Sequence, residues 1–277
     1  GFPRFKSKHH SKNSYTTNVV NGNILVEDNR IRLPKLKWIS MKKHREPAEN
    51  CRLKSVTVSM EPSGKYFASL LYEGYSCENQ AADKDYSNAK ILGIDYAMQG
   101  MAVFSEEIEM EEAGFFRKNE KRLAREQRKL SRCVKGSSNY VRQKKKVARC
   151  HEKIRNQRRD HLHKLSRRIT DQYDIVAVED IDMKAMSQCL HFGKSVQDNG
   201  YGMFRNMLDY KLAWKGKEIV KVDRFFPSSK KCSKCGKIKK ELKLSERIYR
   251  CTCGNEMDRD RNAAINIREE ARRMLAA

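Results

Sequence analysis

Two short apolar runs, each ending in a carboxylate, constrain the fold of this chain most. Residues 91–94 lead into Asp95, and residues 175–178 lead into Glu179. Short runs rich in β-branched residues are typical of buried strands. In an open α/β sheet, a carboxylate at the end of such a strand lies at the edge where sites usually form. The two runs therefore predict an α/β sheet with Asp95 and Glu179 at one edge.

The segments around these runs predict the order of the sheet. Residues 101–104 are apolar and are expected to return beside the first strand as a hairpin. A helical pattern covers residues 203–214, and residues 219–222 form another short strand-like run. The order strand, hairpin, helix, strand, helix, strand is that of an RNase H-like sheet.

A third carboxylate, Asp260, lies in the segment Asp-Arg-Asp-Arg-Asn at residues 258–262. Three carboxylates on separate elements can converge and hold two Mg²⁺ ions for phosphodiester cleavage. We expect Asp95 and Asp260 to share a Mg²⁺ that activates water. Asp95 and Glu179 would share a second that stabilises the leaving 3′ oxygen.

Each carboxylate also has a structural interpretation. Asp95 could end a strand in a turn, Glu179 could pair with an arginine, and Asp258 or Asp260 could cap the helix that is expected to start near Asn262. Taken together, the three favour a metal site. Between the two aspartates we favour Asp260 as the ligand, which leaves Asp258 either as a group that supports the ligands from behind or as the helix cap.

Four of the nine cysteines form one cluster, Cys232, Cys235, Cys251 and Cys253, with 15 residues between the two pairs. Two such knuckles can place four thiolates around Zn²⁺ at about 2.3 Å. Four filled positions predict a structural zinc ribbon that fixes the loop carrying Asp260. Redox-active thiols are the alternative. The odd cysteine count favours a reducing cytosol over a disulfide scaffold.

Positive charge is concentrated in one part of the chain. The sequence has 59 Lys and Arg against 35 Asp and Glu, for a net charge of +24, and residues 117–168 hold 21 basic residues against 4 acidic ones. Such an excess attracts a polyanion by counterion release. A merely charged surface or a membrane-surface role is the alternative. No apolar stretch approaches the roughly 20 residues of a membrane-spanning helix, and the first residues lack a signal-peptide pattern.

Residues 136–139 (Gly-Ser-Ser-Asn) should break this basic segment into two helices. A buried stripe at helical spacing is expected on the second helix, formed by Val147, His151, Ile154, Leu162, Leu165 and Ile169. The other faces of the helix carry Arg and Lys, and this charge favours contact with a phosphate backbone over a helical hairpin that is only solvated. Tyr140 and His151 could stack on bases or pack. The candidate basic contacts are Arg122, Arg125, Lys129, Lys144, Lys145, Arg149, Arg155, Arg158 and Arg159.

The N-terminal third is β-rich. Strand-like runs occupy residues 24–26, 31–33, 53–58 and 66–72, and the turn at residues 62–65 should join the last two as a hairpin. This pattern predicts a partial β-barrel. The polar residues 76–89 read as a linker.

The motifs quoted above resemble the TnpB, or OrfB-type transposase, family, which is related to type V CRISPR nucleases. The matching segments lie at residues 93–95, 178–181, 224–230 and 232–267. The resemblance implies a RuvC-type, Mg²⁺-dependent DNA endonuclease directed by a guide RNA from its own mobile element. Asp95, Glu179 and Asp260 match the family's three carboxylates. Tyr15 and Thr16 lie in a segment that looks like one near flanking-motif DNA.

The resemblance implies four regions. These are a partial wedge-type barrel at 1–89, a RuvC-like core at 90–230 with a basic helical insertion at 115–170, a zinc ribbon at 231–254, and a final RuvC segment at 255–277. Because the chain opens with Gly1 and lacks the family's N-terminal lobe, we expect an N-terminally truncated member. We expect it in the prokaryotic cytoplasm, associated with the nucleoid, with DNA and guide RNA as partners and no membrane.

Two competing interpretations remain open. A non-catalytic nucleic-acid-binding remnant or regulator of the same family would share these motifs. A strand-transferring transposase would use the same type of sheet, but such enzymes typically order their acids Asp, Asp, Glu, whereas here Glu179 lies between Asp95 and Asp260.

Overall fold

The structure, a computed structural model, describes residues 13–47, 49–74, 86, 88–97, 101–108, 115–182, 200–243 and 245–276. The chain divides into two compact units, described separately below. The first comprises residues 1–78 and 126–149, and the second comprises residues 79–125 and 150–277.

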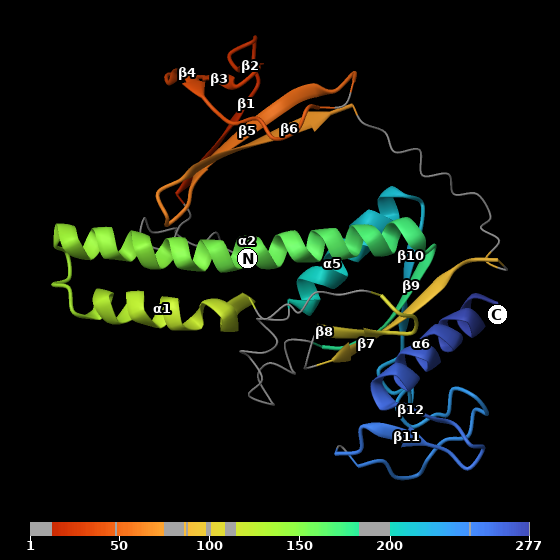
Figure 1. Cartoon of the computed structure of the whole chain (residues 1–277). Coiled ribbons are helices and arrows are strands. Elements are labelled where there is room, and N and C mark those ends of the chain that lie inside the picture. The colour runs from red at the N-terminus through yellow and green to blue at the C-terminus, as the bar shows by residue number, and fades with distance from the viewer. Residues whose placement is uncertain are drawn as a thin grey trace, which may run out of the picture. The chain divides into compact units, whose positions relative to one another are not determined.

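A four-stranded sheet forms the centre of the second unit (Figure 1). Its strands are β7 (Ile91–Ala97), β8 (Met101–Phe104), β9 (Ile175–Glu179) and β10 (Glu218–Val222), in the spatial order β10-β9-β7-β8. β7 pairs antiparallel with β8 and parallel with β9, and β9 pairs parallel with β10. The predicted strands and the hairpin after Asp95 are confirmed.

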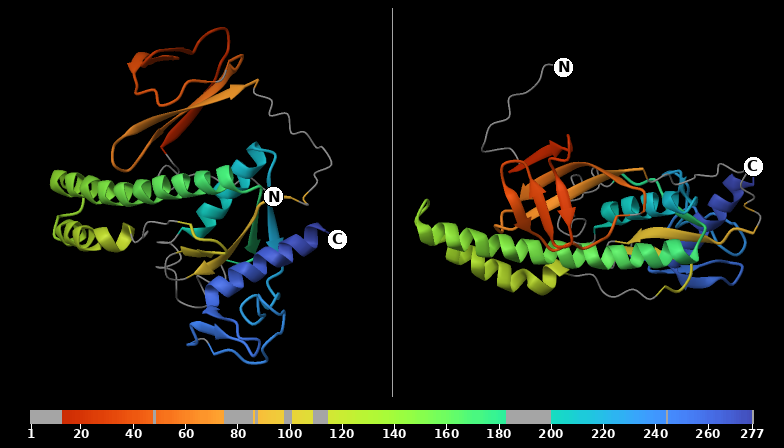
Figure 2. Two further views of the ribbon diagram at one scale, coloured as in Figure 1. Left: turned by 45° about the vertical axis from the view of Figure 1, so that its right-hand side comes forward. Right: turned by 90° about the horizontal axis from the view of Figure 1, so that it is seen from above.

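Helices cover both faces of this sheet (Figures 1 and 2). On one face, alternate strand residues pack with the C-terminal part of α2 (Ser138–Gln172) and with α5 (Tyr201–Trp214) in one apolar cluster. On the other face, a second cluster includes residues of α6 (Arg259–Leu275). Because successive strand residues point to opposite faces, a sheet buried on both sides is apolar at every position, as the two runs are.

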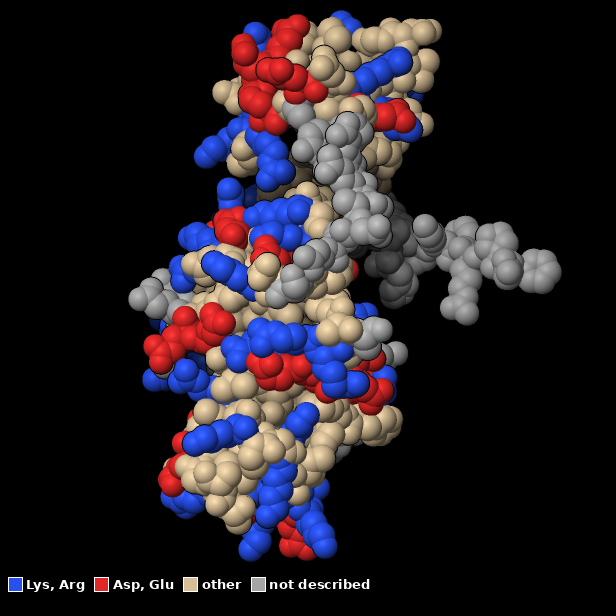
Figure 3. Space-filling model, turned by 90° about the vertical axis from the view of Figure 1, so that its right-hand side faces the viewer, with Lys and Arg blue, Asp and Glu red and all other residues tan. Residues whose placement is uncertain are grey.

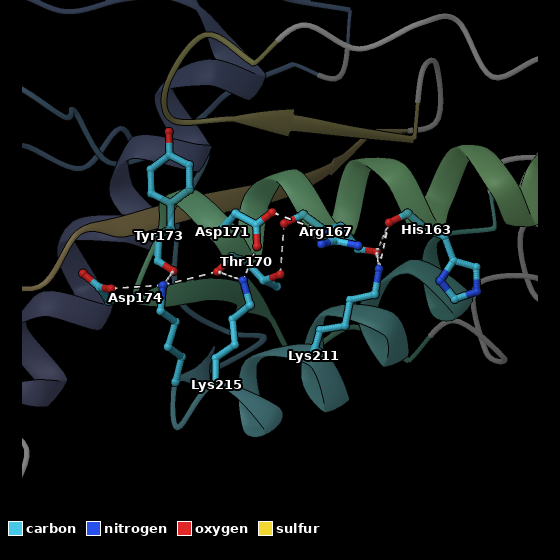
Figure 4. A network of polar contacts seen from close by, with 10 residues as sticks. His163, Arg167, Thr170, Asp171, Tyr173, Asp174, Lys211 and Lys215 are labelled. Atoms are coloured by element: carbon cyan, nitrogen blue, oxygen red, sulfur yellow. Dashed lines mark hydrogen bonds and ion pairs between the residues drawn. The ribbon is translucent and has the colours of Figure 1, made fainter. Parts of the chain in front are cut away.

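Lysines from α5 and the turn after it bind the C-terminal end of α2 (Figure 4). Lys211 Nζ donates to the His163 carbonyl oxygen at 2.7 Å, and Lys217 Nζ donates to the Tyr173 carbonyl oxygen at 2.8 Å. Lys215 Nζ donates to the Thr170 carbonyl oxygen at 3.1 Å. The last carbonyls of a helix lack intrahelical partners and carry partial negative charge, so the ammonium groups of Lys215 and Lys217 stabilise the helix end, whereas Lys211 binds a carbonyl inside the helix.

The basic segment forms two helices, as predicted. α1 (Phe115–Ser131) and α2 are separated by a turn in which Gly136 has φ of +86°. Ser137 caps α2, because its Oγ accepts a hydrogen bond from the Tyr140 backbone N–H at 3.1 Å.

The predicted buried stripe on α2 is only partly correct. Ile154, Leu162, Leu165 and Ile169 are buried, and Val147 is half-buried. His151 is exposed, so its place in the stripe was wrong. At 3.6 residues per turn the stripe passes through Cys150, which is half-buried, and not through its neighbour.

The first unit contains two small sheets. β1 (Ser14–Asn18) pairs with β5 (Arg52–Met60), which pairs with β6 (Tyr66–Glu73) as the predicted hairpin. β1 was not predicted because its sequence, Ser-Tyr-Thr-Thr-Asn, has no apolar alternation and is mostly exposed. Of the predicted linker at 76–89, only residues 86, 88 and 89 lie within the described residues.

The second small sheet has the order β2-β3-β4, formed by β2 (Leu25–Glu27), β3 (Arg30–Leu33) and β4 (Lys37–Ser40). The first two match predicted strands, and β4 was missed because all four of its residues are exposed. A small apolar cluster stabilises the unit, and its buried members are Ile24, Ile31, Leu33 and Val56.

None of the described helices combines the length and the apolar composition needed to cross a membrane. Lys and Arg side chains are spread over the face drawn in Figure 3, with Asp and Glu side chains between them.

Candidate metal and nucleic-acid sites

Asp95 and Glu179 lie on the same face of the central sheet. In the parallel register of β7 and β9, Ile91 is opposite Ile175 and Gly93 is opposite Ala177. Asp95 follows Gly93 by two residues and Glu179 follows Ala177 by two residues, and strand residues two apart share a face of the sheet. Ile91, Ile175 and Ala177 belong to the cluster that includes residues of α6. Both carboxylates therefore lie on the side of the sheet that α6 covers, Glu179 at the end of β9 and Asp95 two residues before the end of β7.

Asp260 reaches this edge from the first turn of α6. The strand before the helix, β12 (Glu256–Asp258), pairs with β11 (Ile248–Arg250), and Asp258 caps the helix. Its Oδ1 accepts hydrogen bonds from the backbone N–H groups of Asp260 at 2.9 Å and Arg261 at 3.0 Å. The predicted capping role of Asp258 is confirmed. The helix begins at Arg259, three residues before the expected start.

The electrostatics of Asp95 show that the three carboxylates are neighbours. Burial, followed by the charges of Glu179 and Asp260, raises the pKa of Asp95 to about 8, although Arg259 and the Tyr96 backbone act in the opposite direction. Burial also raises the pKa of Glu179. Three acids that lie close together and partly away from water repel one another when all are ionised. The site therefore favours either a bound proton or a bound cation.

Asp260 has arginine partners in this arrangement. Its Oδ1 lies 3.2 Å from Arg259 Nε, and its Oδ2 lies 3.7 Å from Arg247 Nη1. Oxygen donors of this type suit Mg²⁺. Because burial and the neighbouring acids raise the pKa of Asp95, a bound cation would favour its ionised form, so the donor set fits a divalent cation.

Tyr201 was missed by the sequence analysis. It begins α5, it is 1% exposed, and its ring packs edge-on against Tyr96 at a centroid distance of 4.9 Å. Burial, followed by the charge of Asp95, raises the pKa of its hydroxyl. The ring closes the opposite face of the sheet beside Asp95. No sequence signal distinguishes it from an ordinary core tyrosine.

The four cysteines converge as predicted. The Sγ atoms of Cys232 and Cys253 lie 3.7 Å apart, as do those of Cys235 and Cys251. All four lie within 4.8 Å of one another, so the short Cys-Thr-Cys knuckle reaches the same centre as the longer one. Four thiolates around one point match a tetrahedral zinc site. The cluster can therefore hold a zinc ion.

The surroundings of Cys232 favour the thiolate that a metal requires. Burial raises the pKa of the thiol, but hydrogen bonds from the backbone of Cys235 and Lys234 and from the Asn255 side chain outweigh it and lower the pKa to about 6. Asn255 Nδ2 lies 3.5 Å from Cys232 Sγ.

Two buried asparagines connect the cysteine cluster to α6. Asn262 Oδ1 accepts from the Ser233 backbone N–H at 3.1 Å, and its Nδ2 donates to the Lys231 carbonyl oxygen at 2.8 Å. Asn266 Nδ2 donates to the carbonyl oxygens of Ser228 at 2.8 Å and Lys231 at 2.6 Å. Neither asparagine was predicted to have a role in the site. Polar residues at helical spacing in an apolar helix face were the available signal.

The candidate nucleic-acid contacts are mostly on the surface. Of the nine basic residues proposed on α1 and α2, Arg158 is half-buried and the rest are exposed. Tyr15 and Thr16 are exposed on β1, where Thr16 Oγ1 forms a 2.8 Å hydrogen bond with Thr57 Oγ1. Tyr140 is half-buried and His151 is exposed.

Comparisons with known proteins agree with this architecture. Residues 74–190 match the OrfB_IS605 family, described as "Probable transposase", and residues 201–267 match the Cas12f1-like TNB domain. A solved Cas12f1–sgRNA–target DNA complex contains a similar mixed α/β fold, with a TM-score of 0.53 and 20% identity over 79% of this chain and 46% of that one.

Two curated relatives are similar over nearly the whole chain. A Streptomyces pristinaespiralis protein, named as a candidate RNA-guided DNA endonuclease, is 35% identical over 96% of this chain. InsQ of Escherichia coli K12, named in the same way, is 32% identical over 99% of this chain. The chain spans 64% and 70% of these relatives' lengths, respectively. The chain therefore belongs to the OrfB/IS605-type transposase family, together with proteins named as RNA-guided DNA endonucleases.

Proposed function

We propose that this chain contains the cleavage centre of an RNA-guided DNA endonuclease of RuvC type, with Asp95, Glu179 and Asp260 as the ligands of two Mg²⁺ ions. The observation that carries the proposal is that Asp95 and Glu179 lie on the same face of β7 and β9, with Asp260 near enough that its charge and that of Glu179 help to raise the pKa of Asp95. The sheet order and the names of the relatives support it.

Each residue would have a separate task. Bound Mg²⁺ supplies an acidified water and charge stabilisation on the scissile phosphate. Asp95, on which the charges of both other acids act, would be a ligand shared by the two ions. Glu179 holds the leaving-group side. Asp260 would hold the other side of the site, in exchange for its contact with Arg259.

The other regions would bind and position nucleic acid. The basic residues of α1 and α2 would lie along the guide–target duplex, which is held by its backbone and shape while base pairing reads the sequence. The partial wedge-type barrel at 1–89, with Tyr15 and Thr16, would contact DNA near the flanking motif. The cysteine cluster would hold structural zinc, and the asparagine bonds to α6 would transmit that order to Asp260.

Plasmid cleavage with Mg²⁺ tests this function, using the chain co-expressed with the RNA of its own mobile element. We expect guide-dependent cutting that is lost in Asp95→Ala and kept in Asp160→Asn, an exposed carboxylate on α2. RNA binding without cutting in the parent chain would contradict the nuclease proposal and support a non-catalytic binder. Equal cutting by Asp95→Ala would show that the site lies elsewhere.

A further inference from the structure

Phe225 is unusual among the apolar residues of the chain. Its side chain is 86% exposed, more than any other large apolar side chain in the described part of the chain. A phenylalanine in water loses the free energy that burial would supply. This exposure suggests that a partner covers the Phe225 ring when the protein functions.

The backbone around Phe225 is held in place. The Phe225 N–H donates to Asp223 Oδ1 at 2.7 Å, and the Phe226 N–H donates to the Asp223 carbonyl oxygen at 3.0 Å. These bonds form a turn stabilised by an aspartate side chain. The next ring, Phe226, is half-buried and lies 5.2 Å from Lys231 Nζ. The turn therefore presents Phe225 to solvent while its neighbour packs inward.

Both flanks of this turn are tied to the carboxylate site. On one side, Val222 is paired with Glu179 in the sheet, and the Arg224 guanidinium lies 3.4 Å from the Asp180 carboxylate. On the other side, Asn266 of α6 binds the Ser228 carbonyl oxygen. Three residues of chain span at most about 10 Å, so Phe225 lies close to the strand end that carries Glu179.

We propose that Phe225 is a base-stacking residue for an unpaired nucleotide of the strand that enters the carboxylate site. This inference rests on the proposed nuclease function and names the form of its substrate, a locally single-stranded segment. An aromatic ring offers a face on which any base can stack, so the contact positions the strand without reading its sequence. The ring would fix the strand near Glu179 while other groups hold the scissile phosphate.

The surroundings favour a nucleic acid over a protein partner. Lys221, Arg224 and Lys230 are exposed on either side of the turn, with Asp223 as the acidic residue among them. A protein interface normally buries a contiguous apolar patch, whereas here the neighbouring ring is half-buried and the remaining neighbours are charged. One exposed ring among cations matches the combination used for single strands.

Binding of a single-stranded oligodeoxynucleotide that contains 2-aminopurine tests the proposal. The Asp95→Ala chain, loaded with its RNA, serves as the parent, so that binding is measured without cleavage. We expect quenching of the 2-aminopurine fluorescence in the parent, loss of quenching with about tenfold weaker binding in Phe225→Ala, and retention of both in Phe225→Trp. Trp214→Ala is the matched control, because Trp214 is 64% exposed at the other end of α5 from Tyr201.

Several outcomes would overturn the assignment. One is equal quenching and affinity in Phe225→Ala, and another is no binding of the oligonucleotide by the parent. A change of oligomeric state in Phe225→Ala with unchanged quenching would make the ring a protein contact. Cleavage by the chain with Asp95 intact is scored separately. If the base stacks but the chain does not cleave, the nuclease function is refuted and the stacking role of Phe225 is kept. If the chain cleaves but Phe225→Ala shows the quenching and affinity of the parent, the stacking role is refuted and the nuclease function is kept.

Discussion

Gly93 lies directly against the backbone of Ala264. A Cβ atom at Gly93 would lie 2.0 Å from the Ala264 carbonyl oxygen and 2.9 Å from Arg268 Cβ. The absence of a side chain at this position lets α6 pack on β7, two residues before Asp95. The closeness of Asp260 to Asp95 therefore depends on a glycine.

Gly93→Ala should displace α6 and destabilise the protein, because neither the strand nor the helix backbone can yield cheaply. We expect a loss of about 2 kcal/mol or more in the free energy of unfolding, as for overpacking in a core, together with loss of Mg²⁺-dependent cutting. Gly202→Ala is the control. Its Cβ would meet nothing within 4 Å inside α5, so it should stabilise the helix by up to about 1 kcal/mol. Unaltered melting of Gly93→Ala would contradict the packing.

Asp258→Ala should weaken the start of α6. The Asp258 carboxylate accepts hydrogen bonds from two N–H groups of the first turn, and loss of such a cap costs about 0.5–2 kcal/mol. Asp260 follows in that turn, so cutting should decrease as well, measured beside the melting temperature. Asp258→Asn keeps the cap and should stay close to the parent in both measurements. Loss of cutting in Asp258→Asn with a melting temperature close to that of the parent would indicate a ligand role for Asp258.

The sheet could be predicted because it is buried on both faces. Ile91–Ala97 and Ile175–Glu179 are apolar at nearly every position, and only a covered parallel sheet needs that. Asp95 and Glu179 stand out because they end such runs. Asp258 and Asp260 were predicted to have different roles, and the structure distinguishes them because Asp258 caps α6 whereas Asp260 lies in the first turn.

Other parts carried weaker signals. β1 and β4 are exposed and polar or mixed, so no alternation identifies them. His151 was placed in the buried stripe because the neighbouring position, Cys150, gives a similar spacing; only the rotation of the helix decides between adjacent residues. The tasks of Asn262 and Asn266 depend on carbonyl oxygens distant in sequence, which no local pattern contains.

Asn266→Leu should destabilise the loop between β10 and the cysteine cluster. The change leaves the Ser228 carbonyl oxygen without the amide donor that binds it, and the Lys231 carbonyl oxygen keeps only its bond from Asn262, inside a site where Asn266 is 3% exposed. An unsatisfied buried polar group costs about 1–3 kcal/mol. Chemical denaturation measures the loss. Asn255, half-buried beside the Cys232 thiol, is the comparison. If Asn255→Ala lowers the free energy of unfolding as much as Asn266→Leu does, the second bond that Asn266 donates adds nothing to stability.

Cys232→Ser should release zinc and lower stability, because one of four thiolates around the ion is lost. We expect a zinc content near one ion per chain in the parent and near zero in the variant, measured by metal analysis of the purified protein, with a lower Tm. Cys133→Ser is the matched control, since Cys133 donates only to the Lys129 carbonyl oxygen at 3.3 Å on α1. Retention of zinc with normal melting in Cys232→Ser would refute the zinc site.

The metal-free protein should become less stable as the pH rises from about 4 to about 8. In the folded state the pKa of Asp95 is about 8, above its ordinary value of 3.8, so in this window the folded chain holds a proton that the unfolded chain has released. Stability decreases with pH wherever the folded state binds more protons. Asp95→Asn removes the group that titrates. The Tm of this variant should therefore exceed that of the parent at pH 8 and approach it at pH 4.

The Tm difference at pH 8 should be about 10 °C, since a pKa rise from 3.8 to about 8 corresponds to several kcal/mol and about 1 kcal/mol corresponds to about 2–4 °C for a unit of this size. Mg²⁺ should raise the Tm of the parent at pH 8, because a cation offsets the repulsion of Glu179 and Asp260, and it should raise that of Asp95→Asn much less. Asp160→Asn, at an exposed carboxylate on α2, should follow the parent at every pH. The same pH slope in the parent and in Asp95→Asn would show that Asp95 is ionised without a metal, and the Mg²⁺ proposal would then lose its electrostatic basis.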